Sequence, residues 1–121
     1  MEQQKKAFGS WGEQRAAAYL AEQGFKILKL NFRLGQVGEI DIVAEDKNTL
    51  VFVEVKTQSS DTMGDALLWV TPKKQRQIGR VAQAYLAFNK ITNRDCRFDV
   101  VNVSRREHDV EIKHIPNAFW L

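Results

Sequence analysis

Two acidic residues and one lysine have the types and the spacing needed for metal-dependent chemistry. Asp41 lies in the stretch Gly-Glu-Ile-Asp-Ile-Val-Ala, and Glu54 and Lys56 lie in Leu-Val-Phe-Val-Glu-Val-Lys-Thr. A Mg²⁺ ion in a protein is usually bound by one or two carboxylates, while waters and phosphate oxygens complete its shell. Lys56 is two residues beyond Glu54, so the two side chains share one face of a strand, where the lysine could contact a phosphate or a metal-bound water.

The segments that carry these residues are expected to form a β-hairpin. Both are rich in β-branched residues, and the polar residues Asp46-Lys47-Asn48-Thr49 separate them, which is typical of a hairpin turn. An even loop centred on Lys47-Asn48 makes one face wholly apolar and pairs Ile40 with Val55, Ile42 with Val53, and Ala44 with Val51. The other face then pairs Val43 with Phe52, Asp41 with Glu54, and Glu39 with Lys56. An odd loop would mix the faces, because a slip of one residue turns every side chain over.

A cation would explain why this register sets Asp41 opposite Glu54. Like charges directly opposite each other destabilise a sheet, in which cross-strand pairs contribute roughly 0.2–1 kcal/mol. A hairpin that served only stability would gain nothing from this pair. A hard divalent cation between the two carboxylates would make their proximity favourable. The register therefore predicts a metal site on this face.

The alternative interpretation of the same face is an ordinary solvated surface of mixed charge. Glu39 opposite Lys56 would then be a cross-strand ion pair without a chemical role. However, Val43 and Phe52 make the face partly apolar, and strands covered on both faces are typical of the middle of an α/β sheet. Carboxylates at such a position need a reason, which favours the functional interpretation.

The two stretches of the hairpin resemble the YraN family of bacterial proteins, and the similarity covers nearly the whole chain. The core of that family is similar to the PD-(D/E)xK nucleases and to the archaeal Holliday-junction resolvases, in which an Asp and a Glu on neighbouring strands hold Mg²⁺. The resemblance implies that Asp41, Glu54 and the carbonyl of Val55 bind Mg²⁺ or Mn²⁺, and that Lys56 assists the attacking water. Ile40 stands where the superfamily motif has Pro.

Glu13 has two interpretations, which require different orientations of its carboxylate. Residues 10–22 are expected to form a helix with Ser10 as N-cap, Glu13 three residues later as in a capping box, and Gly24 as the residue that ends it. In the second interpretation, Gly12-Glu13 resembles the helix-borne Glu beside the metal site of the junction resolvases, which makes Glu13 a fourth catalytic candidate. The expected apolar stripe of this helix contains Trp11, Ala18, Tyr19 and Leu20.

The chain after the hairpin contains patterns for one helix and two strands. The helix begins at Thr71-Pro72, because Thr is a good N-cap and Pro suits the first helical position. Its buried face is expected to contain Ile78, Val81, Ala82, Tyr85 and Leu86. Strands are expected at residues 97–103 and 110–113, and Pro116 is expected to end the last one so that residues 117–120 fold back on the core. A helical connection of this length places the strand at 97–103 parallel to the second strand of the hairpin.

With a first strand expected at residues 25–32, the elements follow the order helix, three strands, helix, two strands. This order predicts a mixed five-stranded sheet flanked by helices (αβββαββ), and the length of the chain suits a single domain over residues 1–121. Together with the resemblance, it implies a restriction-endonuclease-like α/β fold.

Basic residues near the hairpin and at the start of the second helix are candidates for phosphate contacts: Arg33, Lys73, Lys74 and Arg76. A solvated basic face is the usual fate of such residues, but the positive end of the helix dipole and the neighbouring polar loop favour a phosphate site. That loop, residues 58–66, follows Lys56 and is either a segment that orders over the site with substrate or an ordinary solvated connection.

The composition sets limits on compartment and partner. Eighteen basic and fifteen acidic residues give a net charge of +3, which permits binding to polyanions without establishing it. The single cysteine, Cys96, excludes an intrachain disulfide and suits a reducing compartment. No apolar run approaches the ~20 residues of a membrane span. We therefore expect a cytoplasmic protein with no membrane partner.

These patterns lead to one favoured function and two alternatives. The favoured function is Mg²⁺-dependent hydrolysis of DNA phosphodiester bonds. The resemblance to resolvases points to branched or flapped DNA, and symmetric cutting of such DNA would require a homodimer. The first alternative is a nucleic-acid-binding module of the same fold that does not cleave. The second is a protein-interaction adaptor that docks a partner through the apolar tail around Phe119 and Trp120.

Overall fold

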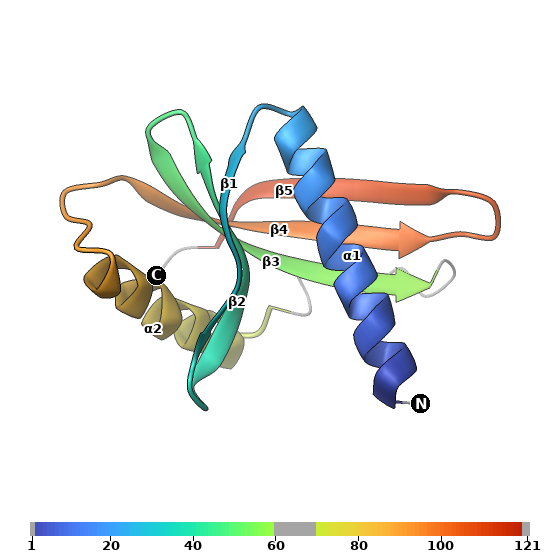
Figure 1. Ribbon diagram of the computed structural model, residues 1–121, viewed down its shortest axis with the longest axis horizontal. Coiled ribbons are helices and arrows are strands. Elements are labelled where there is room, and N and C mark those ends of the chain that lie inside the picture. The colour runs from blue at the N-terminus through green and yellow to red at the C-terminus, as the bar shows by residue number, and fades with distance from the viewer. Residues whose placement is uncertain (1, 60–69, 120–121) are drawn as a thin grey trace.

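A single five-stranded sheet forms the centre of the protein, and a helix packs on each of its faces (Figure 1). The computed structural model describes residues 2–59 and 70–119, with side chains from residue 7 onward. The elements are α1 (Glu2–Glu22), β1 (Lys26–Leu34), β2 (Gly38–Asp46), β3 (Thr49–Ser59), α2 (Pro72–Phe88), β4 (Cys96–Arg105) and β5 (Val110–Phe119). The strand order is β1-β2-β3-β4-β5, and only β3 and β4 run parallel among these neighbours. The predicted αβββαββ order and the mixed sheet are confirmed.

The hairpin of β2 and β3 has the predicted loop and, near that loop, the predicted register. Lys47 and Asn48 form the turn, and Lys47 adopts a φ of 57°, a left-handed conformation that tight hairpin turns use. The ladder pairs Ile42 with Val53, Val43 with Phe52, and Ala44 with Val51. Thus the alternation of apolar residues was sufficient to select this part of the register.

Farther from the turn the predicted register is wrong, because the two strands separate. The ladder ends at the pair of Ile42 and Val53. Oδ2 of Asp41 then accepts a hydrogen bond of 2.8 Å from the backbone N–H of Val55, so a side chain takes the place of a backbone partner. The expected pairs that are absent from the described ladder are Ile40 with Val55, Asp41 with Glu54, and Glu39 with Lys56.

The separation also moves Ile40 to the opposite face of the sheet from the one predicted. Ile40 packs in the core cluster beneath α2, whereas Ile42 packs in the cluster beneath α1. At the same level of β1, Asn31 adopts a φ of 55°, and the ladder of β1 and β2 passes from the Ile42 pair to the Ile40 pair without a pair between them. A local break in alternation turns the following side chains over.

Helix α1 lies close to the sheet because small residues face it. Gly12, Ala16 and Leu20 are buried at intervals of four residues.

The helix ends in a turn in which Gly24 has a φ of 97°. Two bonds close this end, from the Gly24 N–H to the Ala21 carbonyl and from the Phe25 N–H to the Leu20 carbonyl, as in a Schellman motif. The C-terminal residue of the helix was therefore predicted correctly.

The start of α1 was predicted incorrectly, and its apolar stripe was predicted correctly except at Ala18. The helix begins at Glu2, so Ser10 is an exposed interior residue and not an N-cap. Ala18 is exposed, whereas Ala16 is fully buried. Leu20 is fully buried, and Trp11 and Tyr19 pack against the same cluster as predicted. Ala16 was missed because a small residue carries a weak hydrophobic signal.

Replacing Gly12 with alanine is expected to destabilise the protein. A Cβ at this position would lie 2.8 Å from both Cβ and Cγ2 of Thr57 on β3, so α1 would have to move away from the sheet. Overpacking of this kind costs about 1–3 kcal/mol, which exceeds the ~0.5–1 kcal/mol that alanine gains over glycine in a helix. Urea unfolding followed by circular dichroism measures the change.

Gly9→Ala is the matched control for that substitution. It lies in the same helix, and no described atom lies within 4 Å of its added Cβ. It should therefore stabilise the protein by about 0.5–1 kcal/mol. Equal effects of the two substitutions would contradict a close approach of α1 to β3 at Gly12.

Helix α2 begins and packs as predicted. Thr71 caps it, since its hydroxyl oxygen accepts a hydrogen bond of 3.2 Å from the Lys74 N–H, and Pro72 is the first helical residue. The buried residues are Ile78, Val81, Ala82 and Tyr85, and Leu86 is partly buried against the same cluster.

In the part of the chain that the structure describes, neither helix combines the length and the apolar character needed to cross a membrane.

The last strand continues past Pro116, which was predicted to end it. Strand β5 runs to Phe119 at the edge of the sheet, a position at which proline is tolerated because its missing N–H faces away from the ladder. Phe119 is buried and stacks on Phe98 at 5.1 Å. It is therefore a core residue and not part of an exposed docking tail, while Trp120 lies outside the described residues.

A buried carboxylate joins β4 to β5. Asp99 is fully buried and accepts hydrogen bonds from Arg97, from the Asn117 N–H and, at 2.7 Å, from His114. Burial alone would raise the pKa of Asp99, but these hydrogen bonds hold it below its usual value. His114 thus has a structural role at this edge of the sheet.

Candidate metal centre

A cleft of about 430 Å³ opens where β2 and β3 separate. Residues from α1, β2, β3 and α2 line it, among them Glu13, Asp41, Glu54, Val55, Lys56 and Lys74. These include every residue that the sequence predicts for catalysis or metal binding. The separation of the strands, which the sequence did not predict, creates the space between them.

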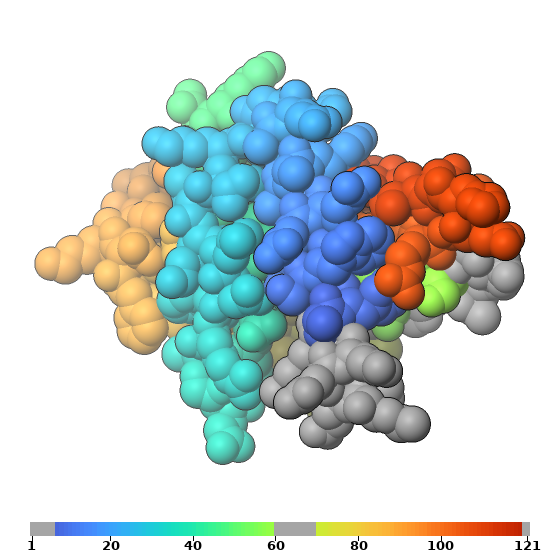
Figure 2. Space-filling model, turned by 45° about the vertical axis from the view of Figure 1, so that its right-hand side comes forward, coloured from blue at the N-terminus to red at the C-terminus, as the bar shows by residue number. Residues whose placement is uncertain are grey.

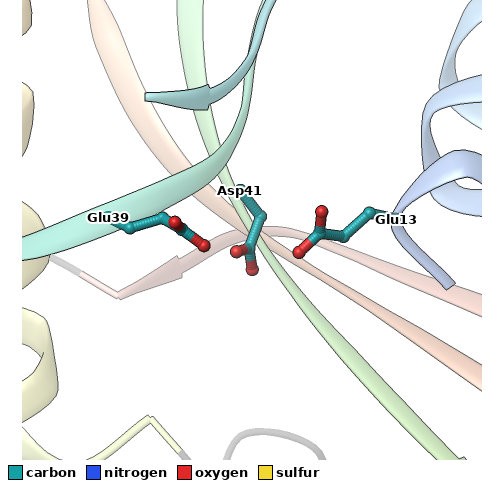
Figure 3. Close-up of side chains that lie close together, drawn as sticks. All are labelled: Glu13, Glu39 and Asp41. Atoms are coloured by element: carbon teal, nitrogen blue, oxygen red, sulfur yellow. The ribbon is translucent and has the colours of Figure 1, made fainter. Parts of the chain in front are cut away.

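Three carboxylates point toward one another at the edge of this cleft (Figure 3). Glu13 extends from α1, Glu39 and Asp41 extend from β2, and one oxygen of each lies within 4.8 Å of the others. Opposite ligands of one Mg²⁺ ion are about 4.2 Å apart, because each Mg–O bond is ~2.1 Å long. The three groups are therefore near the spacing that a single ion would impose.

The capping interpretation of Glu13 is wrong. Because α1 begins at Glu2, Glu13 is an interior residue of the helix, and its side chain is not needed to cap the first turn. The side chain hydrogen-bonds with that of Asn31 and with Asp41. The close approach of α1 at Gly12 thus places the next residue, Glu13, against β2.

Burial and mutual repulsion act on the protonation of these acids. Burial raises the pKa of Asp41 to about 9, and the charge of Glu54 acts in the same direction, while the hydrogen bond from Val55 opposes the rise. Burial also raises the pKa of Glu13 and of Glu54, and at Glu54 the charge of Lys74 opposes the rise. Acids whose pKa is perturbed within a cleft are candidates for a functional site.

Lys74 lies in the cleft, although the sequence suggested that it binds the nucleic-acid backbone outside it. Its Nζ atom is 2.6 Å from Oε1 of Glu54. Glu54 is the more buried partner, with 11% of its side chain exposed against 46% for Lys74. The lysine therefore neutralises one of the two carboxylates that were predicted to bind a metal.

Glu39 is the acid that sequence reasoning missed. It was interpreted as a possible cross-strand partner of Lys56, an interpretation that depended on β2 and β3 staying paired. Because the strands separate at Asp41, Glu39 instead lies beside Glu13 and Asp41. Its place in the Gly-Glu-Ile-Asp stretch, two residues before Asp41, was the only available signal.

The other basic candidates are exposed and lie outside the cleft lining. Arg33 is on β1, opposite Glu39 in the ladder, and its Nε atom donates to the Gly35 carbonyl at 3.1 Å. Lys73 and Arg76 are on the exposed side of α2, and Arg76 lines a separate hollow on that helix. The structure therefore does not bring these three basic residues into the lining of the cleft.

The expected loop over the site was predicted to begin at Gln58. Instead, Gln58 and Ser59 belong to β3, and the Gln58 side chain is buried and donates to Oγ of Ser104 at 3.4 Å. Residues 60–66 of that expected loop lie outside the described part of the chain.

The donor set of the cleft fits a hard divalent cation. It consists of carboxylate oxygens, and such ligands suit Mg²⁺ or Mn²⁺ better than they suit Zn²⁺, which favours nitrogen and sulfur. The raised pKa of Asp41 is a second indication, because burial and the charges of the neighbouring acids disfavour its ionised form, and a bound cation would offset both effects. Glu13, Glu39, Asp41 and Glu54 are therefore the residues that could hold the ion.

A larger hollow of about 620 Å³ lies between the turn of the hairpin and the end of β5. Its charged residues already bind one another, since Arg97 contacts Asp46 at 3.1 Å and Asp99 at 3.0 Å. The smaller cleft is therefore the better candidate for a functional site, because its acids lie close together and are not matched by an equal number of positive charges.

Comparison with known proteins identifies the family. Residues 12–103 match the model of the family described as "Uncharacterised protein family UPF0102". The chain is 48% identical to a UPF0102 protein of Syntrophotalea carbinolica over 98% of this chain and 96% of the relative. It is 47% identical to a UPF0102 protein of Geobacter metallireducens over 96% of this chain and 94% of the relative. The chain belongs to the UPF0102 family, which is the YraN family that its hairpin resembles.

Proposed function

We propose that this protein is a metal-dependent endonuclease that hydrolyses phosphodiester bonds of DNA. The observation that carries the proposal is the convergence of Glu13, Asp41 and Glu54 with Lys56 in one cleft. The resemblance of the hairpin to PD-(D/E)xK nucleases agrees with this arrangement. When bound, the metal ion would stabilise negative charge on the phosphate and acidify a bound water.

The residues of the chain would divide the work of binding and orientation. Asp41 and Glu54, with Glu13 and Glu39 beside them, would hold the ion. The Val55 N–H fixes the Asp41 carboxylate in position at 2.8 Å. Lys56, exposed at the mouth of the cleft, would orient the attacking water and contact the scissile phosphate.

The exposed basic residues around the cleft would bind the substrate on either side of the scissile bond. Arg33, Lys73 and Arg76 are exposed and suit contacts to phosphates, which give affinity without sequence readout. The family resemblance favours branched or flapped DNA as the substrate, and symmetric cutting of a four-way junction would involve a homodimer. Affinity that depends on phosphate contacts should fall steeply as salt rises.

Lys56→Met is expected to separate catalysis from metal binding. Removing the lysine should lower cleavage by about 10²–10³-fold, because one charged contact to the reacting phosphate is worth ~3–4 kcal/mol. The affinity for Mn²⁺ should stay near that of the wild type, since the carboxylates are intact. Cleavage is measured on single-stranded, duplex, flapped and four-way DNA with Mg²⁺ or Mn²⁺, and metal affinity by titration calorimetry.

The wild-type protein on the same DNA panel tests the proposal itself. Cleavage that requires a divalent metal and stops in EDTA supports it. Tight DNA binding without cleavage in either metal would show a binding module instead. Absence of DNA affinity even at low salt would contradict both the nuclease proposal and the binding-module alternative.

A further inference from the structure

The position of Lys74 is determined by the first turn of α2. Its backbone N–H donates to the cap residue Thr71, and the Gln75 side chain donates to the Val70 carbonyl at 2.9 Å. These bonds hold the turn in place at the edge of the cleft. From here the flexible side chain of Lys74 extends inward to Glu54.

The helix itself gains nothing from a lysine at this position. The N-terminus of a helix carries partial positive charge, so a cation in the first turn is unfavourable to it. The first turn of α2 contains no acidic residue that would compensate. The partner of Lys74 is instead Glu54, a nearly buried carboxylate on a different element. The cleft and not the helix therefore accounts for this lysine.

The charges of the cleft show what the lysine replaces. Four carboxylates lie in and beside it, from Glu13, Glu39, Asp41 and Glu54, and two lysines accompany them. Metal binding requires the ligand carboxylates to be ionised, and in that state two negative charges remain, which is the charge that one divalent cation balances. A nearly buried carboxylate such as Glu54 also needs a positive partner when the ion is absent.

We infer that Lys74 occupies the place of the cation at Glu54 in the metal-free protein and transfers to a phosphate oxygen of the nucleic acid once Glu54 binds the ion. This rests on the proposed function. The side chain of Lys74 is 46% exposed, so its ammonium group can turn from Glu54 toward the mouth of the cleft. Lys74 thus couples metal binding to substrate binding.

Lys74→Gln is expected to change two affinities in opposite directions. Without DNA, the variant should bind Mn²⁺ at least about fivefold more tightly, because the ion no longer displaces an ammonium group whose ion pair is worth ~1 kcal/mol. With Ca²⁺, which occupies oxygen sites, its affinity for DNA should fall by about fivefold or more. Without metal, its affinity for DNA should match the wild type, because Lys74 is then engaged with Glu54. Titration calorimetry and fluorescence anisotropy give these values.

Lys73→Gln is the matched control, since it removes the same charge from the adjacent, exposed position of α2. It should leave Mn²⁺ affinity nearly unchanged and weaken DNA binding equally with and without Ca²⁺. Lys74→Arg keeps the charge, so it should retain the metal affinity of the wild type, and it also serves if the Gln variant does not fold.

The results separate this inference from the proposed function. If the wild type binds no divalent ion, both fail. If the wild type binds the ion and cleaves DNA, but Lys74→Gln binds Mn²⁺ no more tightly, the inference alone is overturned. An equal loss of DNA affinity in Lys74→Gln with and without Ca²⁺ would also overturn it.

Discussion

Asp41→Asn is expected to abolish tight binding of divalent metal, to lower DNA cleavage by at least about 10³-fold and to stabilise the metal-free protein. The first two effects follow because metal binding supplies several kcal/mol of transition-state stabilisation, and each 1.4 kcal/mol is about tenfold in rate. Asp41 lies among Glu13, Glu39 and Glu54, so losing its charge removes an essential part of the ligand set.

The gain in stability has a separate cause. The pKa of Asp41 is raised to about 9 by burial and by the charge of Glu54, so its ionised form is unfavourable in the folded protein. Asparagine is neutral, yet its side-chain oxygen can still accept the hydrogen bond from the Val55 N–H. A substitution that stabilises a protein and removes its activity is typical of a functional site.

Titration calorimetry with Mn²⁺, a cleavage assay and urea unfolding measure the three effects. Asp46→Asn is the matched control, because Asp46 is also on β2 but contacts Arg97 at the far end of the strand. It should keep both metal affinity and cleavage and should not stabilise the protein. Unchanged Mn²⁺ affinity in Asp41→Asn would contradict the placement of the ion.

The stability of the metal-free protein is expected to fall as the pH rises. The folded-state pKa of Asp41, at about 9, lies above its ordinary value of 3.8, so the folded protein retains a proton that the unfolded chain has released. Between the two values the unfolded state binds fewer protons, and the free energy of unfolding therefore decreases with pH. Because one pKa unit corresponds to ~1.4 kcal/mol, the loss between pH 5 and pH 8 should be about 2–4 kcal/mol. The raised pKa values of Glu13 and Glu54 act in the same direction.

Urea unfolding in EDTA at a series of pH values measures this dependence. Asp41→Asn should flatten the profile, since the group with the largest shift no longer titrates. Saturating Mg²⁺ should also reduce it, because a bound ion favours the ionised carboxylates and its affinity rises with pH. Stability of the metal-free wild type that rises between pH 5 and pH 8 would contradict the burial of these acids.

Local patterns in the sequence determined the elements and much of the sheet. The polar break at Lys47-Asn48 and the apolar alternation around it determined the hairpin and its inner register. Thr71-Pro72 determined the start of α2. These features depend on neighbouring residues and on which face is apolar, so they are visible in the chain itself. The start of α1 was missed because the residues before Ser10 carry no capping signal.

Tertiary structure alone decided how the acids meet. The sequence brought Asp41 and Glu54 together as a cross-strand pair, whereas in the structure they share a cleft because β2 leaves β3 at Asp41. The entry of Glu39 into the cluster and of Lys74 into the cleft follows from the same separation and from the position of α2. Such contacts join elements that are distant in the chain, and their geometry depends on packing between them, which no local pattern encodes.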